Sequence, residues 1–512
     1  MTRLKSQHKE IIIFGIVTLL TTILFFLLVK DWGIQYAVDS QSYVELGAMH
    51  GVKPIYPLFL FVHKLLFGEE AYLQAAVISQ GLLSVGCSLG LVFYLKKLFG
   101  LHYIEVYICY CLSLLVYMIE WPNFISSQYI LTEAITYPLF YLYFITVLQV
   151  IYKGGWKSIV LCGVMSFLLA MTRSQLLLVM GITSVAFTIA LARNQLISKR
   201  VTVKNLLLVI VKGVVVIPLT LYLGIQSVNY GMTVYLSAYA TIESISTQAT
   251  ANDSVTNMGV EDQEALEAAV QTVEVVNVTY SDNQSSHALW QRLSYTIDEE
   301  DVALFDDPHF QEIFSQLYEA IDEAQQRYPY RPKNLWTWEH IANSTNQNAS
   351  ITDEITDAYR IAHAEDPTFQ EDSISIKDKL SSQLLREHWL DYLYYTLCLF
   401  PQSFVCTVFF QIESIYLLCH IITLFLYISA IVMSILCVKN KKLDTKVGIY
   451  MFTVLVASCC FIVATNLVFY GIQRYLYYIF GTFYIGYFLL LCQMYRGYLQ
   501  AWWKTHRKSN CK

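Results

Sequence analysis

The chain has 512 residues, of which 55% are hydrophobic and only 14% are charged, and its mean hydropathy is +0.45. Apolar runs of about twenty residues recur along it, each long enough to cross a hydrocarbon core of ~30 Å. This composition excludes an ordinary soluble protein, and the acidic charge gathered in residues 229–390 makes that segment a poor candidate for nucleic-acid binding, which needs a basic surface. We therefore predict an all-α polytopic membrane protein with about ten transmembrane helices.

The first apolar run, residues 11–29, is long and has no small-residue cleavage site, so we interpret it as a retained anchor helix. Basic residues before it and after every second span place both termini in the cytoplasm under the positive-inside rule. The protein is then a multi-pass cell-membrane protein. The ten predicted spans are 11–29, 71–95, 103–119, 133–152, 157–172, 175–192, 205–228, 412–437, 447–468 and 475–495.

The first external loop, residues 31–70, carries Asp39 just after the first span. Asp39 and Tyr43 share one helical face, and Pro54 and Pro57 break any helix before the chain returns to apolar sequence. We expect a short surface helix, a rigid turn, and then residues 58–67 dipping along the membrane. A carboxylate held where lipid meets water is partly desolvated, which suits a general base. The alternative is a solvated loop with incidental acids.

Residues 1–228 form the predicted transmembrane core, and residues 229–390 form an acidic soluble extracytoplasmic domain. That second segment holds 28 acidic and 8 basic residues, a net charge of −20. Its Asp307-Pro308 pair predicts a helix start with proline in the first turn. Apolar residues then recur at helical spacing, at Phe310, Ile313, Phe314, Leu317 and Ile321. The domain is therefore expected to be mainly helical.

Residues 391–512 are predicted to hold an interfacial helix and the last three spans. The segment 382–411 is rich in Leu, Tyr and Phe but also contains charged residues and Pro401, so we expect amphipathic helices on the outer interface. His388 precedes this helix, and either packs structurally or lines a site. Arg474 and Tyr475 open the last span; the arginine is either an interfacial anchor among tyrosines or an anion ligand.

Four short motifs carry a resemblance. They are Asp39-Ser40-Gln41-Ser42-Tyr43 followed by Pro54-Ile55-Tyr56-Pro57, then Ile130-Leu131-Thr132-Glu133, then Leu169-Ala170-Met171-Thr172-Arg173, and last Gln473-Arg474-Tyr475. Together they resemble the GT-C fold membrane glycosyltransferases, the class of protein O-mannosyltransferases, aminoarabinose transferases and RgtA/B/C/D-like bacterial enzymes. Two features depart from the class: Asp39 is not paired with a second acid, and no prolines follow Tyr475.

The resemblance implies an inverting transfer of a sugar from a polyprenyl-phosphate donor to an extracytoplasmic glycan, lipid or protein. Asp39 would act as the general base. Arg173, Arg474 and Tyr475 would bind the donor phosphate, because the leaving lipid phosphate needs positive charge nearby. The acceptor or active site would be lined by Tyr43, Tyr56, Glu133 and His388.

The role of Glu133 stays open at this point, because one carboxylate either positions the acceptor, helps to bind a divalent cation, or simply faces solvent. No metal-ligand spacing is present, so no metal residues are assigned and a divalent cation is only a possible cofactor.

Two other classes of protein fit the composition. A lipid or glycan transporter or flippase places ionisable residues near the middle of broken spans. Here the predicted spans are nearly free of charge and the acids gather at one outer surface, which favours interfacial chemistry. A membrane scaffold would use the acidic external domain to bind a partner.

Overall fold

The computed structural model describes residues 2–36, 40–44, 53–118, 126–197, 289–290, 292–327, 338–366, 373–409, 415–440, 443–468 and 473–509, with a few isolated positions between these ranges. All the regular elements in these ranges are helices. The backbones of Gln35 and Tyr129 form an isolated bridge there, which is not part of a sheet. The predicted helical class is therefore confirmed for the described part of the chain.

Within those ranges, six helices are long and apolar enough to cross a membrane. They are α1 (Thr2–Trp32), α3 (Ile55–Phe99), α5 (Glu133–Lys153), α16 (Tyr416–Lys439), α17 (Thr445–Val468) and α19 (Phe480–Ser509). Three shorter apolar helices are α4 (Tyr103–Leu115), α6 (Trp156–Ala170) and α7 (Leu178–Ile197). The predicted span 205–228 lies largely outside the described residues, so the count of ten spans stays a prediction.

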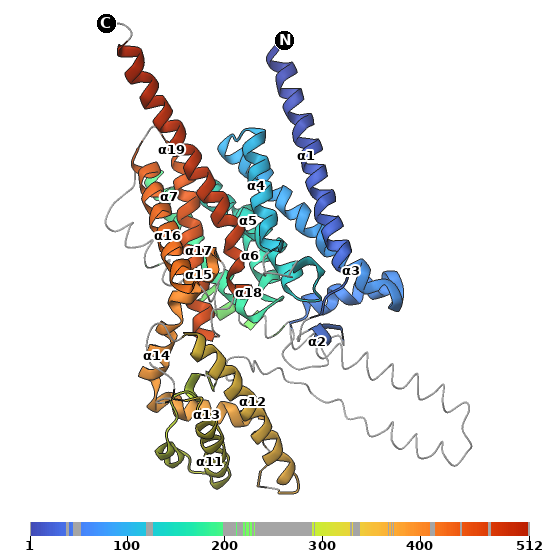
Figure 1. Cartoon of the computed structure of the whole chain (residues 1–512), viewed down its shortest axis with the longest axis vertical. Helices are drawn as coiled ribbons and strands as arrows, with labels where there is room; N and C mark the ends of the chain where they lie inside the picture. Colours follow the sequence, from blue (N-terminus) through green and yellow to red (C-terminus); the bar gives the residue numbers. More distant parts are fainter. Residues whose placement is uncertain are drawn as a thin grey trace, which may run out of the picture.

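The bundle has α5 near its centre and α1 at its edge. Of the apolar span in α5, 78% is buried inside the protein, against 11% of the span in α1. Figure 1 shows both chain termini at one end of the bundle and α11–α13 at the opposite end. The placement of the termini in the cytoplasm and of the acidic domain outside the membrane stays a prediction.

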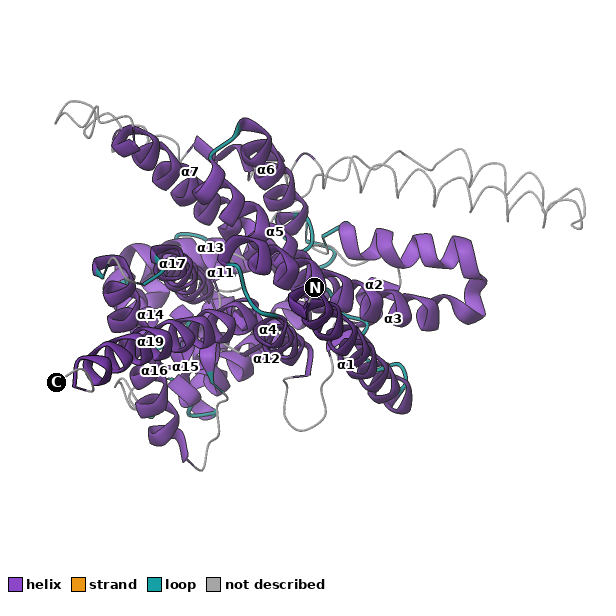
Figure 2. Cartoon of the chain, turned by 90° about the horizontal axis from the view of Figure 1, so that it is seen from above, coloured by secondary structure: helices purple, strands orange, loops and turns teal. Residues whose placement is uncertain are grey.

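Helix α3 is too long for one span because it folds back on itself at Gly68. The φ of Gly68 is 74° and its ψ is 172°, a conformation that essentially only glycine adopts. His63 Nε2 lies 2.8 Å from Ser79 Oγ, although sixteen residues of straight helix would separate them by about 24 Å. Residues 55–67 and 69–99 are therefore two antiparallel arms, and Figures 1 and 2 show the bend between them.

The described part of the external domain consists of η4 (Glu299–Leu304), α11 (Pro308–Glu323), α12 (Trp338–Ala362) and α13 (Ser373–Glu387). The predicted start of α11 is confirmed, since Asp307 Oδ1 accepts a hydrogen bond from the backbone N–H of His309 at 2.9 Å. The predicted apolar stripe is also confirmed. Its five members are buried and join Trp290, Tyr359 and Leu380 in a separate core.

The segment 382–411 is only partly as predicted. Helix α14 (Trp389–Cys398) exposes an apolar face with Trp389, Leu390, Leu393 and Leu397, as expected at an interface. Helix α15 (Phe400–Val408) instead lies inside the bundle. Its Ser403 donates a hydrogen bond to Asn466 of α17 at 2.8 Å. The prediction was wrong for α15 because its small polar side chains find partners on neighbouring helices.

Candidate functional site

The site is built around Arg173, in the turn between α6 and the 3-10 helix η3 (Ser174–Leu177). Its Nη1 pairs with Oε1 of Glu133, the first residue of α5. The side chains are only 12% and 1% exposed, so this is a buried ion pair. The Thr132 hydroxyl donates a hydrogen bond to the other carboxylate oxygen, Glu133 Oε2, at 3.0 Å. The start of α5, where the helix dipole favours an anion, also suits the carboxylate.

Two tyrosines from the far end of the sequence complete the wall around Arg173. The ring of Tyr475 in α18 (Gln473–Leu476) lies 4.9 Å from the guanidinium carbon, in cation–π contact. Tyr478 follows in the 3-10 helix η6 (Tyr477–Ile479), and its hydroxyl lies 3.1 Å from Thr136 Oγ1 of α5. Residues about 300 positions apart thus meet at one end of α5.

The first loop reaches the same place. The rings of Tyr43, in the short helix α2 (Ser40–Val44), and Tyr56 are edge to face at 5.2 Å. Tyr56 accepts a hydrogen bond from Gln80 Nε2 at 2.7 Å. The backbone N–H of Ile55 donates to the carbonyl of Met171 at 3.4 Å, two residues before Arg173. Contacts therefore connect the Pro54 turn to the arginine.

The electrostatic balance on Arg173 reflects these neighbours. Burial lowers the pKa of its guanidinium, but the carboxylate of Glu133 and the phenols of Tyr478, Tyr475 and Tyr43 raise that pKa well above its ordinary value. The guanidinium is therefore a permanent cation in a dry setting, where its field acts strongly on a bound anion.

Asp39 lies outside the described residues, but its flanks are anchored. The backbone N–H of Gln35 donates to Gln128 at 3.1 Å, and the N–H of Ile130 donates to Gln35 at 3.1 Å. Ser40 on the other side is 1% exposed. These contacts attach the loop to the segment that leads directly into Glu133. Arg474 belongs to α18, and its side chain lies outside the described residues.

Lys53 is a candidate that the sequence reasoning did not select. Its side chain is only 3% exposed, which is rare for lysine unless it has a specific partner. It stands directly before Pro54, in the stretch that contacts Met171. The sequence signal that could have identified Lys53 is its position immediately before the Pro-x-Tyr-Pro turn. The prolines restrict the backbone there and so hold the lysine in a defined place.

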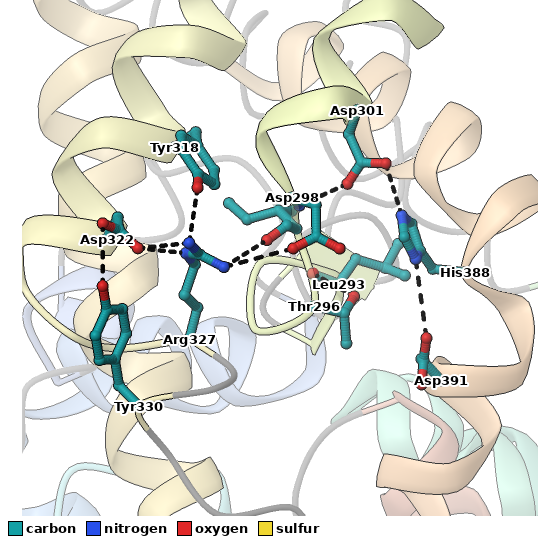
Figure 3. A network of polar contacts seen from close by, with 11 residues as sticks. Leu293, Thr296, Asp298, Asp301, Tyr318, Asp322, Arg327, Tyr330, His388 and Asp391 are labelled. Carbon is teal, nitrogen blue, oxygen red and sulfur yellow. Dashed lines mark hydrogen bonds and ion pairs between the residues drawn. The ribbon is translucent and has the colours of Figure 1, made fainter.

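His388 belongs to a different part of the molecule, the junction between α13 and α14 (Figure 3). Its Nε2 lies 2.8 Å from Asp301 Oδ1, and its Nδ1 lies 3.9 Å from Asp391 Oδ2. The hydrogen bond to Asp301 raises the pKa of His388; burial opposes this effect. These contacts join the external domain to α14 rather than to the Arg173 cluster.

A second set of hydrogen bonds, made by Arg292, also connects the external domain to α14. Arg292 donates to the hydroxyls of Tyr392 at 3.2 Å and Thr396 at 2.8 Å, and burial lowers its pKa to about 10. Tyr392 in turn donates to the carbonyl of Leu467, at the end of α17, at 2.8 Å. The external domain is therefore hydrogen-bonded through α14 to a membrane-length helix.

Two observations bear on the divalent cation that the sequence left possible. In the described part of the chain, no three His, Cys, Asp or Glu side chains gather in a way that could hold a metal ion. Glu133, the carboxylate considered for a divalent cation, is paired with Arg173. A guanidinium in contact with that carboxylate repels a second cation.

No protein family, curated protein or solved structure matches this chain. The chemistry of the site must therefore be inferred from its residues. An anionic group attached to a lipid would suit this site. The site combines the buried cations of Arg173 and Lys53 with several tyrosine side chains, at one end of apolar helices.

Proposed function

We propose that this protein is a GT-C-type membrane glycosyltransferase that moves a sugar from a polyprenyl-phosphate donor to an extracytoplasmic acceptor, with inversion at the anomeric carbon. The main observation behind this proposal is the buried ion pair of Arg173 and Glu133. The Tyr475 ring packs against the guanidinium, and backbone contacts connect the pair to the loop that bears Asp39. The short motifs that resemble the GT-C class include these same residues.

Arg173 suits the donor phosphate because its guanidinium is held in place on two sides. Glu133 takes Nη1, and the Tyr475 ring covers one face. The outer N–H groups retain a planar donor edge that matches phosphate oxygens. The carboxylate keeps the buried cation compensated before the donor arrives, which avoids the cost of an unpaired buried charge.

In the proposed step, the acceptor hydroxyl oxygen attacks the anomeric carbon while the bond from that carbon to the phosphate oxygen breaks. The hydroxyl proton passes to Asp39, and the electron pair leaves on the polyprenyl phosphate. Arg173 and Arg474 would stabilise that anion, together with Lys53, which stands two residues before the Ile55–Met171 contact. Tyr43 and Tyr56 would line the acceptor side.

The buried polar floor beside Tyr56 also suits a hydroxyl-rich ligand. Gln80 uses its amide nitrogen on Tyr56, while its Oε1 is buried and finds no hydrogen-bond partner among the described residues. A buried acceptor without a partner costs free energy unless a ligand or water satisfies it. A sugar hydroxyl at this position would remove that cost.

The test uses the full-length protein in proteoliposomes with radiolabelled polyprenyl-phosphate sugars and extracts of cell-surface glycans as acceptor. The wild type should release polyprenyl phosphate, and Asp39→Asn should lose at least a hundredfold in rate, the usual contribution of a general base. Asp31→Asn, in the last turn of α1 shortly before that loop, is the matched control and should retain the rate. Movement of labelled donor across the bilayer without cleavage would instead establish a flippase.

A further inference from the structure

A groove of about 420 Å³ lies between α1 and α4, at the end of these helices nearer the N-terminus. Its walls are mainly Ile13, Phe14 and Val17 of α1 with Tyr103, Ile104 and Tyr107 of α4. This volume is within the range of small-molecule sites, about 300–1,000 Å³.

The groove is closed at its inner end and apolar at its rim. Thr21 Oγ1 lies 3.0 Å from the Tyr107 hydroxyl, and Thr22 Oγ1 lies 2.8 Å from that of Tyr110, so the helices meet there. The rim residues Ile13 and Ile104 are 61% and 65% exposed. Water molecules would find few hydrogen-bond partners in this groove, because its walls are mainly apolar.

The open end is polar. Glu10 and His102 stand there, and Glu10 is also where the apolar span of α1 begins. The mouth therefore lies where hydrocarbon gives way to headgroups. Lys96 Nζ lies 4.1 Å from the centre of the Tyr103 ring, which places a cation beside the groove.

His102 supplies a hydrogen-bond donor at this mouth. Its backbone N–H donates to Glu105 Oε2 at 2.9 Å, which fixes the residue at the start of α4, and the residue is exposed. Even a neutral imidazole carries one N–H, so the exposed ring can donate. His102 and Lys96 thus supply a donor and a cation on the α4 side, and Glu10 supplies a carboxylate on the α1 side.

We propose that this groove binds one phospholipid, with an acyl chain along its apolar wall and the phosphate held by Lys96 and His102. Glu10 favours a headgroup that carries an ammonium group, such as phosphatidylethanolamine, over one that is only anionic. Bound there, the lipid would fill the gap between α1 and the bundle. The inference rests on the groove alone and does not depend on the proposed transferase activity.

The test is native mass spectrometry of the full-length protein after detergent extraction, titrated with phosphatidylethanolamine or phosphatidylglycerol. One phosphatidylethanolamine should be retained more tightly than phosphatidylglycerol. Lys96→Gln should weaken it about tenfold, as expected for one charge-assisted hydrogen bond. His102→Ser removes the donor but keeps a favourable helix cap, so it should weaken binding without loss of fold. Val17→Trp fills the groove and should abolish binding.

Two matched controls decide the result. Lys97→Gln removes the same charge at the next position, and Ile12→Trp adds the same bulk on α1 beside the groove; both should leave lipid binding unchanged. Equal losses from Lys96→Gln and Lys97→Gln, or equal retention of both lipids, would mean unspecific annular lipid and overturn the proposal. The same spectra report the oligomeric state. If the wild type were a dimer and Val17→Trp a monomer, a second copy of the chain would occupy the groove, and the lipid proposal would be overturned.

Discussion

Arg173 and Glu133 form a buried ion pair that ties the turn after α6 to the first residue of α5. The pair is fixed on both sides, by Thr132 on the carboxylate and by the Tyr475 ring on the guanidinium. Three segments far apart in the sequence thereby share one small polar region. Its stability and its chemistry can be separated by mutation.

Removing only the arginine should destabilise the protein. Arg173→Ala leaves Glu133 buried without its cation, which typically costs about 3–5 kcal/mol. Glu133→Gln together with Arg173→Met removes both charges and should recover most of that loss. Thermal unfolding of the detergent-solubilised chain measures both variants. If Arg173→Ala unfolds at the wild-type temperature, the ion pair does not stabilise the folded protein.

Donor use should depend on positive charge at position 474. Arg474→Ala should weaken the use of polyprenyl-phosphate sugar more than Arg474→Lys, because lysine keeps a cation near the phosphate although it loses the planar fork. Initial rates at several donor concentrations measure this difference. Identical donor kinetics for the two variants would remove Arg474 from the donor site.

The external junction should be stabilised by acid. The folded-state pKa of His388 is raised by Asp301, so its stabilising contribution is fully present below the unfolded pKa and is lost as pH rises through the folded value. The difference in unfolding temperature between wild type and His388→Asn should therefore be larger at pH 5.5 than at pH 8.5. The groups that face His388 are Asp301, Asp391 and, more distantly, Asp298.

A double-mutant cycle serves as the control for this effect. In an Asp301→Asn background the largest cause of the raised pKa of His388 is gone. There the difference in unfolding temperature made by His388→Asn should vary much less with pH. A pH-independent difference between wild type and His388→Asn would contradict the role assigned to the Asp301 contact.

The fold-back of α3 should depend on glycine at one position only. Gly68→Ala forces a side chain into a conformation that essentially only glycine adopts, at a cost of about 1–3 kcal/mol. Gly86→Ala, in the regular part of the same helix with no atom near its added methyl group, should instead stabilise by roughly 0.5–1 kcal/mol. Opposite shifts in unfolding temperature are expected, and equal shifts would argue against the bend.

The sequence by itself determined the helical class, most of the apolar segments and the start of α11, because these depend on local hydrophobicity, periodicity and capping. It also indicated Arg173, Glu133 and Tyr475 separately, from short motifs. Only the tertiary structure decided that Arg173 contacts both of the others, since nothing local links residues 40 or about 300 positions apart. The bend at Gly68, the burial of α15 and the place of His388 beside Asp301 were likewise decided by packing between distant segments. Hydrophobic pattern fixes which face of a helix is apolar, but the partner that covers that face is chosen by the whole bundle.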